Sequence, residues 1–172
     1  MLECHACQSK ANMTISKVDH KLRVLVVDDD IDTADSQCQL LSLLDCKAAS
    51  AFGIATGLQM AALFRPDLIL VDLDLNGEDG CDFVTAARRM QGLSHAMFVC
   101  VTGADTFENR HRCRDSGFSG FLSKPLEVGA LRHYLERASQ QRAESTEDDR
   151  VVIQPRAASF SRSASGSQDA PR

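Results

Sequence analysis

Short aliphatic runs alternate with longer amphipathic segments from Arg23 to about Ser139. Buried runs of this kind, separated by helical stretches, are typical of a parallel sheet that is covered on both faces. The pattern therefore predicts a doubly wound α/β domain built from five strand–helix units. Strands are expected over 24–27, 48–51, 68–71, 97–101 and, from a weaker signal, 120–122.

The segments between these runs are predicted to be helices because their apolar residues recur at helical spacing. The first stripe runs from Ala34 to Leu44, and Asp32 or Thr33 is placed to cap its start. The segment FENRHRCRD is nearly all polar, so a short exposed helix that stops at Gly117 is expected there. The other helices are expected over 54–64, which Pro66 ends, over 83–90, and over 128–138, which follows Pro125.

The two ends of the chain differ from this middle part. Residues 1–21 show no sustained periodicity and are expected to form a flexible leader, which places the folded domain at 22–140. Residues 141–172 have few apolar side chains and are rich in Ser, Arg and Ala. Such a segment buries too little surface to offset the entropy lost on ordering, so a disordered tail is expected over 141–172.

Composition and charge exclude several classes of protein. A chain of 172 residues with 44% hydrophobic residues can bury one sizeable core. Its net charge of −5 argues against nucleic acid as a partner, because that would need a basic face. No apolar run approaches the roughly 18 residues of a membrane helix, and the start MLECHACQSK lacks the features of a secretory signal. We expect a cytoplasmic protein without a membrane partner.

The chain has seven scattered cysteines. Several fall on the apolar faces of expected helices and strands, so their predicted role is that of small buried hydrophobic residues. Cys4, His5 and Cys7 together could suggest zinc. A structural zinc site needs four ligands, however, and no second pair follows at metal-binding spacing.

Polar residues follow four of the expected strands. The first strand delivers Asp28 and Asp29, the third Asp72, the fourth Thr102 and the fifth Lys124. In an open parallel sheet the carboxyl ends of the strands lie at one edge, where ligands bind. Carboxylates gathered there favour a hard cation such as Mg²⁺. With a lysine and a hydroxyl nearby, such a site suits phosphoryl transfer, and a carboxylate can itself accept the group.

Four segments together resemble the receiver domains of two-component response regulators: VLVVDDD, PDLILVDLDLNGEDG, VTGAD and GFSGFLSKPL. The resemblance covers residues 22–138. It implies a flavodoxin-like fold, with a five-stranded parallel sheet in the order 2-1-3-4-5 and helices on both faces. Any one of the acids could be a helix cap or a turn former. The four clusters occurring in order are far more specific than each alone.

The resemblance also implies roles for single residues. Asp72 is the expected phosphoacceptor. Asp28 and Asp29 are expected to hold Mg²⁺ together with Asp72, Asp29 directly and Asp28 through water, while Asp74 contributes its backbone carbonyl. Glu78 and Asp79 belong to the following loop and helix start, where they favour the helix dipole.

Three further residues complete the expected site and its switch. Lys124 is expected to pair with the phosphoryl oxygens, aimed by a cis Lys124–Pro125 bond, and Thr102 to hydrogen-bond the phosphoryl group. Phe121 occupies the position of the family's switch aromatic, where Thr102 movement lets the ring turn inward. As Phe it lacks a hydroxyl, so its inward bias rests on burial.

Two positions depart from the family pattern. Asn76 stands where the family usually has Pro, so the loop after Asp72 is expected to be looser. Ala104, two residues past Thr102, offers no polar group to a hydrolytic water. We therefore expect slow loss of phosphate from the acceptor.

The predicted function is that of a single-domain response regulator, a signalling domain rather than an enzyme. Its expected partners are a histidine kinase or histidine phosphotransfer protein and a downstream protein, and a phosphorylation-dependent homodimer is left open. One alternative is a receiver fold that only docks. Another is a haloacid-dehalogenase-type phosphatase, in which Asp72 and Asp74 would share the chemistry. Against the phosphatase, the acid pair precedes Asp72 and Asn76 replaces Thr or Val.

Overall fold

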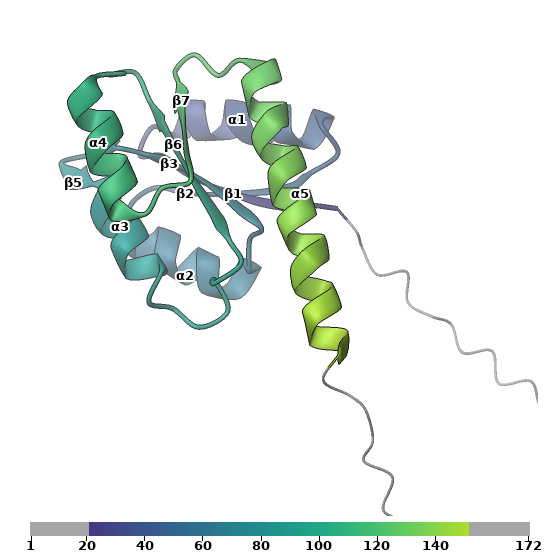
Figure 1. Cartoon of the computed structure of the whole chain (residues 1–172). Coiled ribbons are helices and arrows are strands. Elements are labelled where there is room, and N and C mark those ends of the chain that lie inside the picture. The colour runs from purple at the N-terminus through teal and green to yellow at the C-terminus, as the bar shows by residue number, and fades with distance from the viewer. Residues whose placement is uncertain (1–20, 152–172) are drawn as a thin grey trace, which may run out of the picture.

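A five-stranded parallel sheet forms the centre of the protein in the computed structural model, which describes residues 21–151 (Figure 1). The strand order is β2-β1-β3-β6-β7, which is the predicted order 2-1-3-4-5 of the five long strands. The leader with Cys4, His5 and Cys7, and most of the predicted tail, lie outside the described residues. The strands are β1 (Arg23–Val27), β2 (Lys47–Ala51), β3 (Leu68–Asp72), β6 (Met97–Thr102) and β7 (Gly120–Ser123).

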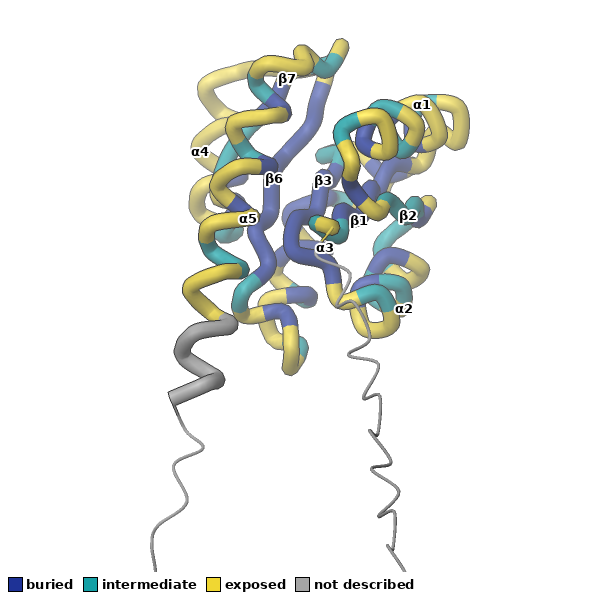
Figure 2. The backbone as a smooth tube through the Cα atoms, turned by 90° about the vertical axis from the view of Figure 1, so that its right-hand side faces the viewer, coloured by how far each residue is buried: buried dark blue, intermediate teal, exposed yellow. Residues whose placement is uncertain are grey.

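Helices cover both faces of this sheet, as the burial pattern along the backbone shows (Figure 2). One core lies under α1 and α5 and the other under α2, α3 and α4. The doubly wound α/β fold predicted from the sequence is therefore confirmed. The helices are α1 (Ile31–Leu43), α2 (Ile54–Phe64), α3 (Gly80–Ala87), α4 (Phe107–Ser116) and α5 (Val128–Val151).

The central strands feed both cores because successive side chains of a strand point to opposite faces. In β1, Val24 and Val26 pack into the core beneath α1 and α5, while Leu25 and Val27 pack into the other. β3 repeats the pattern in register, with Val27 beside Val71. This double burial explains why the aliphatic runs are continuous rather than alternating.

The helix ends correct the sequence prediction at two places. Asp30, rather than Asp32 or Thr33, caps α1: the Thr33 amide donates to its Oδ1 at 2.7 Å. The other correction concerns α5, which runs to Val151, beyond the boundary expected at 140. The predicted stop of α4 at Gly117 is confirmed, with that residue in the left-handed conformation (φ 96°) that favours glycine.

A buried ion pair explains how α5 stays attached beyond the predicted boundary. The Arg142 side chain donates to the Asp67 carboxylate at 3.2 Å and to the Lys21 carbonyl at 2.9 Å. Asp67 is 2% exposed and also accepts the Arg23 amide at 2.8 Å. A buried carboxylate needs such partners, and they fasten the helix to the amino-terminal end of the sheet.

A small hairpin follows β3, formed by β4 (Asp74–Leu75) and β5 (Glu78–Asp79). Its turn consists of Asn76 and Gly77, both with positive φ (56° and 88°). The sequence carried this signal, because Asn-Gly between paired segments is the residue pair that a two-residue hairpin turn prefers. The segment expected to be a looser loop is thus a paired structure in which Asn76 has a turn-forming role.

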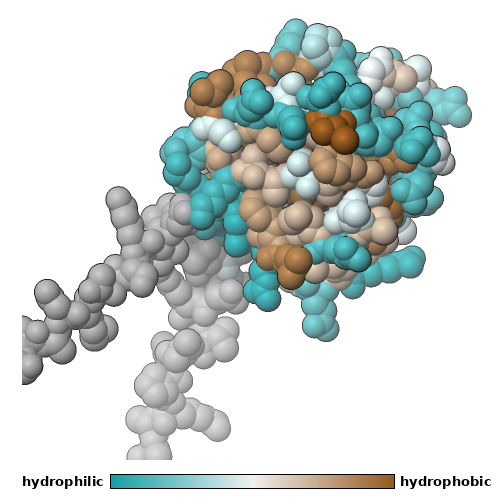
Figure 3. All heavy atoms as spheres, turned by 180° about the vertical axis from the view of Figure 1, so that it is seen from behind, coloured by the Kyte–Doolittle hydropathy of each residue, from teal (hydrophilic) through white to brown (hydrophobic). Residues whose placement is uncertain are grey.

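Among the described residues, every helix is too short or too polar to cross a membrane. Figure 3 shows the face opposite to that of Figure 1, where hydrophobic residues gather. Exposed large apolar residues of the described chain include Leu43, Phe52 and Leu63.

The described cysteines are all free, and burial is the main cause that raises their thiol pKa values. The prediction that these cysteines act as buried hydrophobic residues is confirmed for Cys46, Cys81, Cys100 and Cys113.

Substituting Gly80 tests how tightly α3 is packed against the end of β3. A Cβ atom there would lie 2.1 Å from the Asp72 carbonyl oxygen, so the backbone must shift. We expect Gly80→Ala to lower the free energy of unfolding by about 1–3 kcal/mol, measured by urea denaturation. The control is Gly129→Ala in α5, where nothing lies within 4 Å. It should stabilise the protein by roughly 0.5–1 kcal/mol, and equal effects would contradict this packing argument.

Candidate functional site

Three carboxylates meet at the carboxyl edge of the sheet. Asp28 and Asp29 follow β1, and Asp72 is the last residue of the neighbouring β3. Each offers an oxygen, and these three oxygens lie within 4.8 Å of one another. Asp28 is 2% exposed, Asp72 is half-buried and Asp29 is exposed, so the cluster opens to solvent on one side.

A single ammonium group lies among these acids. Lys124 follows β7, and its Nζ donates to Asp28 Oδ2 at 2.7 Å and to Asp72 Oδ2 at 2.5 Å. Burial by itself would lower the pKa of Lys124, but the two carboxylates outweigh burial and raise that pKa above its ordinary value. The Lys124–Pro125 peptide bond is cis, as predicted.

The other carboxylate oxygens are engaged by backbone amides. Asp28 Oδ1 accepts the Asp30 amide at 3.1 Å, and Asp72 Oδ1 accepts the Asp74 amide at a long 3.4 Å. Asp72 therefore has one oxygen bound tightly to Lys124 and a second that is only weakly held. An oxygen in this condition is the more available of the two for chemistry or for a metal ion.

Thr102 lies at the end of β6, beside β3 in the sheet, and is 5% exposed. Its Oγ1 accepts the Ala104 amide at 3.2 Å, and its carbonyl accepts the Lys124 amide at 2.9 Å. The backbone bond ties the segment that carries Lys124 to the end of β6. Thr102 and Lys124 are therefore placed at the same edge as the acids.

The acids that follow Asp72 serve the hairpin and the helix starts. Asp74 is exposed, and its Oδ1 accepts the Gly77 amide at 3.2 Å within the turn. Glu78 accepts the Ile54 amide at 3.2 Å, at the start of α2 rather than α3. Asp79 caps α3 by accepting the Cys81 amide at 2.9 Å, and it also pairs with Arg112 of α4. The predicted helix-start role of Asp79 is confirmed.

Phe121 lies apart from the acidic cluster. It is half-buried on β7, packed against the core under α4, with Arg110 of α4 over its ring. The structure thus brings together Asp28, Asp29, Asp72 and Lys124 directly, and places Thr102 at the same edge. Asp74 is held in the hairpin turn by its side chain, and Phe121 is separate.

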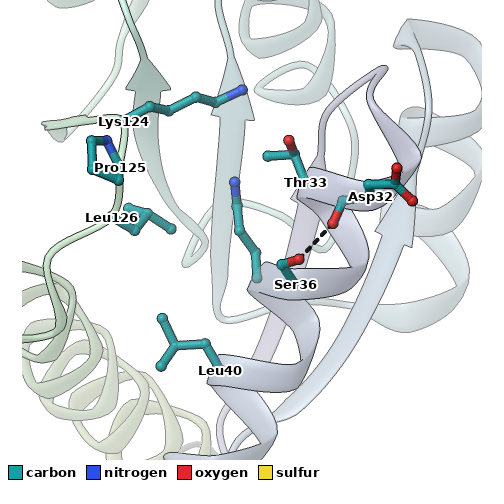
Figure 4. Close-up of a pocket in the computed structure, with 8 residues that line it drawn as sticks. Asp32, Thr33, Ser36, Leu40, Lys124, Pro125 and Leu126 are labelled. Carbon is teal, nitrogen blue, oxygen red and sulfur yellow. Dashed lines mark hydrogen bonds between the residues drawn. The ribbon is translucent and has the colours of Figure 1, made fainter.

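A groove of about 620 Å³ opens beside Lys124, between α1 and the segment that joins β7 to α5 (Figure 4). Polar α1 residues line one wall and Leu126 the other. No pattern in the sequence predicts this groove, because it exists only where α1 packs near that segment. Its lining residues are Asp32, Thr33, Ser36, Gln37, Leu40, Lys124, Pro125 and Leu126.

The charge balance of the cluster defines what it can bind. Three carboxylates face one ammonium group, so negative charge is left over at close range. Carboxylates held like this attract a divalent cation that prefers oxygen ligands. The residues therefore fit Mg²⁺, and a half-buried carboxylate beside a lysine and a possible cation site suits phosphoryl transfer.

A flavodoxin-like sheet with this acidic edge is typical of receiver domains, and comparison with known proteins agrees. Residues 24–136 match the family described as the response regulator receiver domain, so the chain belongs to that family. Members of the family are signalling domains of two-component systems.

Individual proteins are similar to this chain in sequence or in fold. The transcriptional regulatory protein PrrA of Mycobacterium tuberculosis is 36% identical over 110 residues, which are 63% of this chain and 46% of that protein. The chemotaxis response regulator CheY4 of Vibrio cholerae superposes with a TM-score of 0.63 at 24% identity, over 69% of this chain and 98% of that one. A receiver domain from Methanospirillum hungatei JF-1 gives a TM-score of 0.65 at 25% identity, over 72% and 98% of the two chains.

The chain spans less than half the length of PrrA, and a still smaller part of other relatives. Ethylene receptor 2 of Oryza sativa subsp. japonica is 29% identical over 125 residues, which are 69% of this chain but 16% of that protein. The similarity therefore concerns the receiver domain and not the rest of these proteins.

Removing the charge of Lys124 should destabilise the protein, because Asp28 and Asp72 would lose their shared partner. We expect Lys124→Gln to lower the unfolding free energy by about 1–3 kcal/mol, measured by urea denaturation near pH 8 in metal-free buffer. Lys21→Gln is the control, since Lys21 pairs with Asp45 on the exposed surface. Such exposed pairs contribute only about 0–1 kcal/mol.

The stability difference between wild type and Lys124→Gln should depend on pH. The folded protein holds the Lys124 proton more tightly than the unfolded chain does, because its pKa is raised above 10.5. The stabilisation is therefore fully present below that value and is lost as the pH rises through the raised pKa. As the pH is raised from 7, the stability difference between wild type and Lys124→Gln should narrow only in strongly alkaline buffer, and a difference that narrows between pH 7 and 9 would contradict the assignment.

Proposed function

We propose that this receiver domain accepts a phosphoryl group on Asp72 from a phosphohistidine of a partner protein. One observation carries the proposal: Asp72 ends the central strand β3 with one oxygen 2.5 Å from Lys124, inside the acidic cluster. In the reaction, a carboxylate oxygen of Asp72 attacks phosphorus and the P–O bond forms as the P–N bond breaks. The imidazole then leaves and takes up a proton from solvent.

Lys124 and Thr102 would act on the phosphoryl group itself. Lys124 already contacts Asp72, so its ammonium group is placed to neutralise charge on the transferred oxygens. Thr102 would donate its hydroxyl to one of those oxygens. Its Oγ1 now accepts the Ala104 amide, and turning toward the phosphoryl group would weaken that bond.

The acidic cluster would hold Mg²⁺ during this reaction. Asp28, Asp29 and Asp72 would supply carboxylate oxygens, and Asp74 its backbone carbonyl. When bound, Mg²⁺ neutralises charge that develops on the phosphoryl oxygens. The protein's own contribution is to keep the acids close together without the ion. The Lys124 ion pairs with Asp28 and Asp72 reduce the repulsion among the carboxylates.

The groove between α1 and the β7–α5 segment supports a protein as phosphodonor (Figure 4). It runs up to Lys124 and combines polar α1 side chains with Leu40 and Leu126. A helix of a histidine kinase or a histidine phosphotransfer protein would fit beside the acceptor here. The phosphohistidine could then reach Asp72 while the partner's surface is held by the groove.

Phosphorylation would change the surface formed by α4, β7 and α5, through the movement of Thr102 and the Phe121 ring. A downstream protein, or a second copy of this chain, would bind that surface in only one of the two arrangements. The receiver domain would act in this way either as a separate protein or as part of a longer one.

Phosphorylation by a small donor tests the acceptor directly. Incubation with Mg²⁺ and acetyl phosphate should add one phosphoryl group to the wild type, seen by intact-mass analysis. Asp72→Asn should gain none, because an amide cannot accept the group. Asp74→Asn is the matched control, since it keeps the acceptor and changes a neighbouring exposed acid.

Metal dependence belongs to the same experiment. Chelation of Mg²⁺ with EDTA, or the substitution Asp29→Asn, should slow labelling by at least about tenfold, as expected when a catalytic metal or its ligand is removed. Equal labelling of wild type and Asp72→Asn would place the acceptor elsewhere. Labelling that EDTA leaves unchanged would refute the role of the metal.

The lifetime of the phosphorylated form is a separate prediction. Ala104 lines a cavity of about 320 Å³ together with Asp74, Thr102 and Asn109, and offers only a methyl group. We expect the aspartyl-phosphate to last well beyond seconds after the donor is removed. Ala104→Asn should shorten that lifetime by supplying a polar group for water, as followed by intact mass. Decay of the wild type within seconds would contradict the prediction.

A further inference from the structure

The side chain of Arg110 covers the ring of Phe121. Its guanidinium carbon lies 4.6 Å from the ring centroid, a distance at which the cation is attracted to the face of the ring. Arg110 belongs to α4 and Phe121 to β7, two elements that lie side by side (Figure 1). Arg110 therefore fixes the outer side of a ring that is only half-buried.

A carboxylate from the preceding loop holds Arg110 in this place. Arg110 Nε and Nη2 donate to the two oxygens of Asp105, each at 2.5 Å. Asp105 comes three residues after Thr102 in the loop between β6 and α4. The pair is mutually reinforcing: Arg110 is the main cause of the lowered pKa of Asp105, and Asp105 that of the raised pKa of Arg110.

The other neighbours of Phe121 leave room for its ring to move. The Phe121 amide donates to the Tyr134 hydroxyl at 3.2 Å, which fixes the backbone but not the ring. A groove of about 270 Å³ adjoins the ring, lined by Arg110, Phe118 and Tyr134 among others. Phe121 has no hydroxyl, so its ring is restrained on this side by the charged group of Arg110.

We infer that Arg110 is a positioning residue that holds the Phe121 ring in the unphosphorylated arrangement, with Asp105 linking it to the loop that starts at Thr102. The inference rests on the proposed function and names a regulator of its switch. Thr102 Oγ1 holds this loop through the Ala104 amide. When Thr102 turns to the phosphoryl group, the loop loses this bond, Asp105 shifts, and Arg110 releases the ring.

The strength of these contacts suits a switch. The ion pair is exposed, with 53% and 38% of the two side chains accessible, and exposed contacts of either kind are weak. A restraint of this size changes the ratio of the two arrangements only several-fold, so a phosphoryl group can overcome it. In the proposed reaction Thr102 acts on the phosphoryl group from the active arrangement, so the rate of phosphorylation by a small donor should rise with the population of that arrangement.

Removing the charge of Arg110 should therefore speed up phosphorylation. With Mg²⁺ and acetyl phosphate, the full chain carrying Arg110→Gln should be phosphorylated about two- to fivefold faster than wild type, as expected from losing one exposed cation–π contact. Asp105→Asn should also increase the rate of phosphorylation. The matched control is Arg89→Gln, an exposed arginine just after α3 that does not line the groove beside Phe121, which should leave the rate unchanged.

A double substitution separates the ring from a general effect of charge. In a Phe121→Leu background the aromatic face is gone, so adding Arg110→Gln should change the rate no further. An Arg110→Gln effect that persists in that background would overturn the inference, as would an unchanged or slower rate in the single variant. Urea denaturation of each variant confirms that the compared proteins are folded.

A fluorine label gives a readout that does not need phosphorylation. With 4-fluorophenylalanine at position 121, the ¹⁹F resonance should move in Arg110→Gln and Asp105→Asn but not in Arg89→Gln. An unmoved resonance would overturn the inference even if the wild type is phosphorylated. Conversely, a wild type that acetyl phosphate fails to label would refute the proposed function, while the fluorine shift would still decide whether Arg110 positions the ring.

Discussion

Repulsion among the acids at the carboxyl edge of the sheet is the constraint on which the site depends. The parallel arrangement of β1 and β3 forces Asp28, Asp29 and Asp72 into one small region. Lys124 relieves the repulsion by bonding to two of the three carboxylates. Because one lysine cannot neutralise three acids, the region stays attractive to a divalent cation and, with it, to a phosphoryl group. The close carboxylates thus destabilise the folded protein and, for the same reason, let the site bind a cation.

The remaining acids near this edge show how the fold separates structural from chemical roles. Asp30 caps α1, Glu78 accepts an amide at the start of α2, and Asp79 caps α3. Each is exposed or half-buried and bonded to backbone amides, where a carboxylate favours the helix dipole. Asp79 adds a link to Arg112, so the hairpin after the acceptor is tied to α4. Movement near Asp72 therefore has a physical route to the face that carries Arg110 and Phe121.

Much of the fold was predictable because its signals are local. The β1 and β3 strands are continuous aliphatic runs, and Gly117 stops α4 through its own backbone freedom. The predicted cap of α1 lies two or three residues too late because Asp30, Asp32 and Thr33 all have side chains that suit a cap, and only the backbone geometry selects Asp30. The strand pattern does not predict the hairpin, because its paired segments are only two residues long. The Asn76–Gly77 pair is the local signal that indicates its turn.

By itself the sequence determined the order of the five long strands and five helices, the family, and the set of polar residues delivered to one edge, because these follow from periodicity and from residues at strand ends. Tertiary structure decided which of those residues touch. It selected Asp28 and Asp72 as partners of Lys124, fastened α5 through Arg142 and Asp67, and laid Arg110 over Phe121. Such contacts join residues distant in sequence or set by side-chain conformation, so only packing in three dimensions defines them.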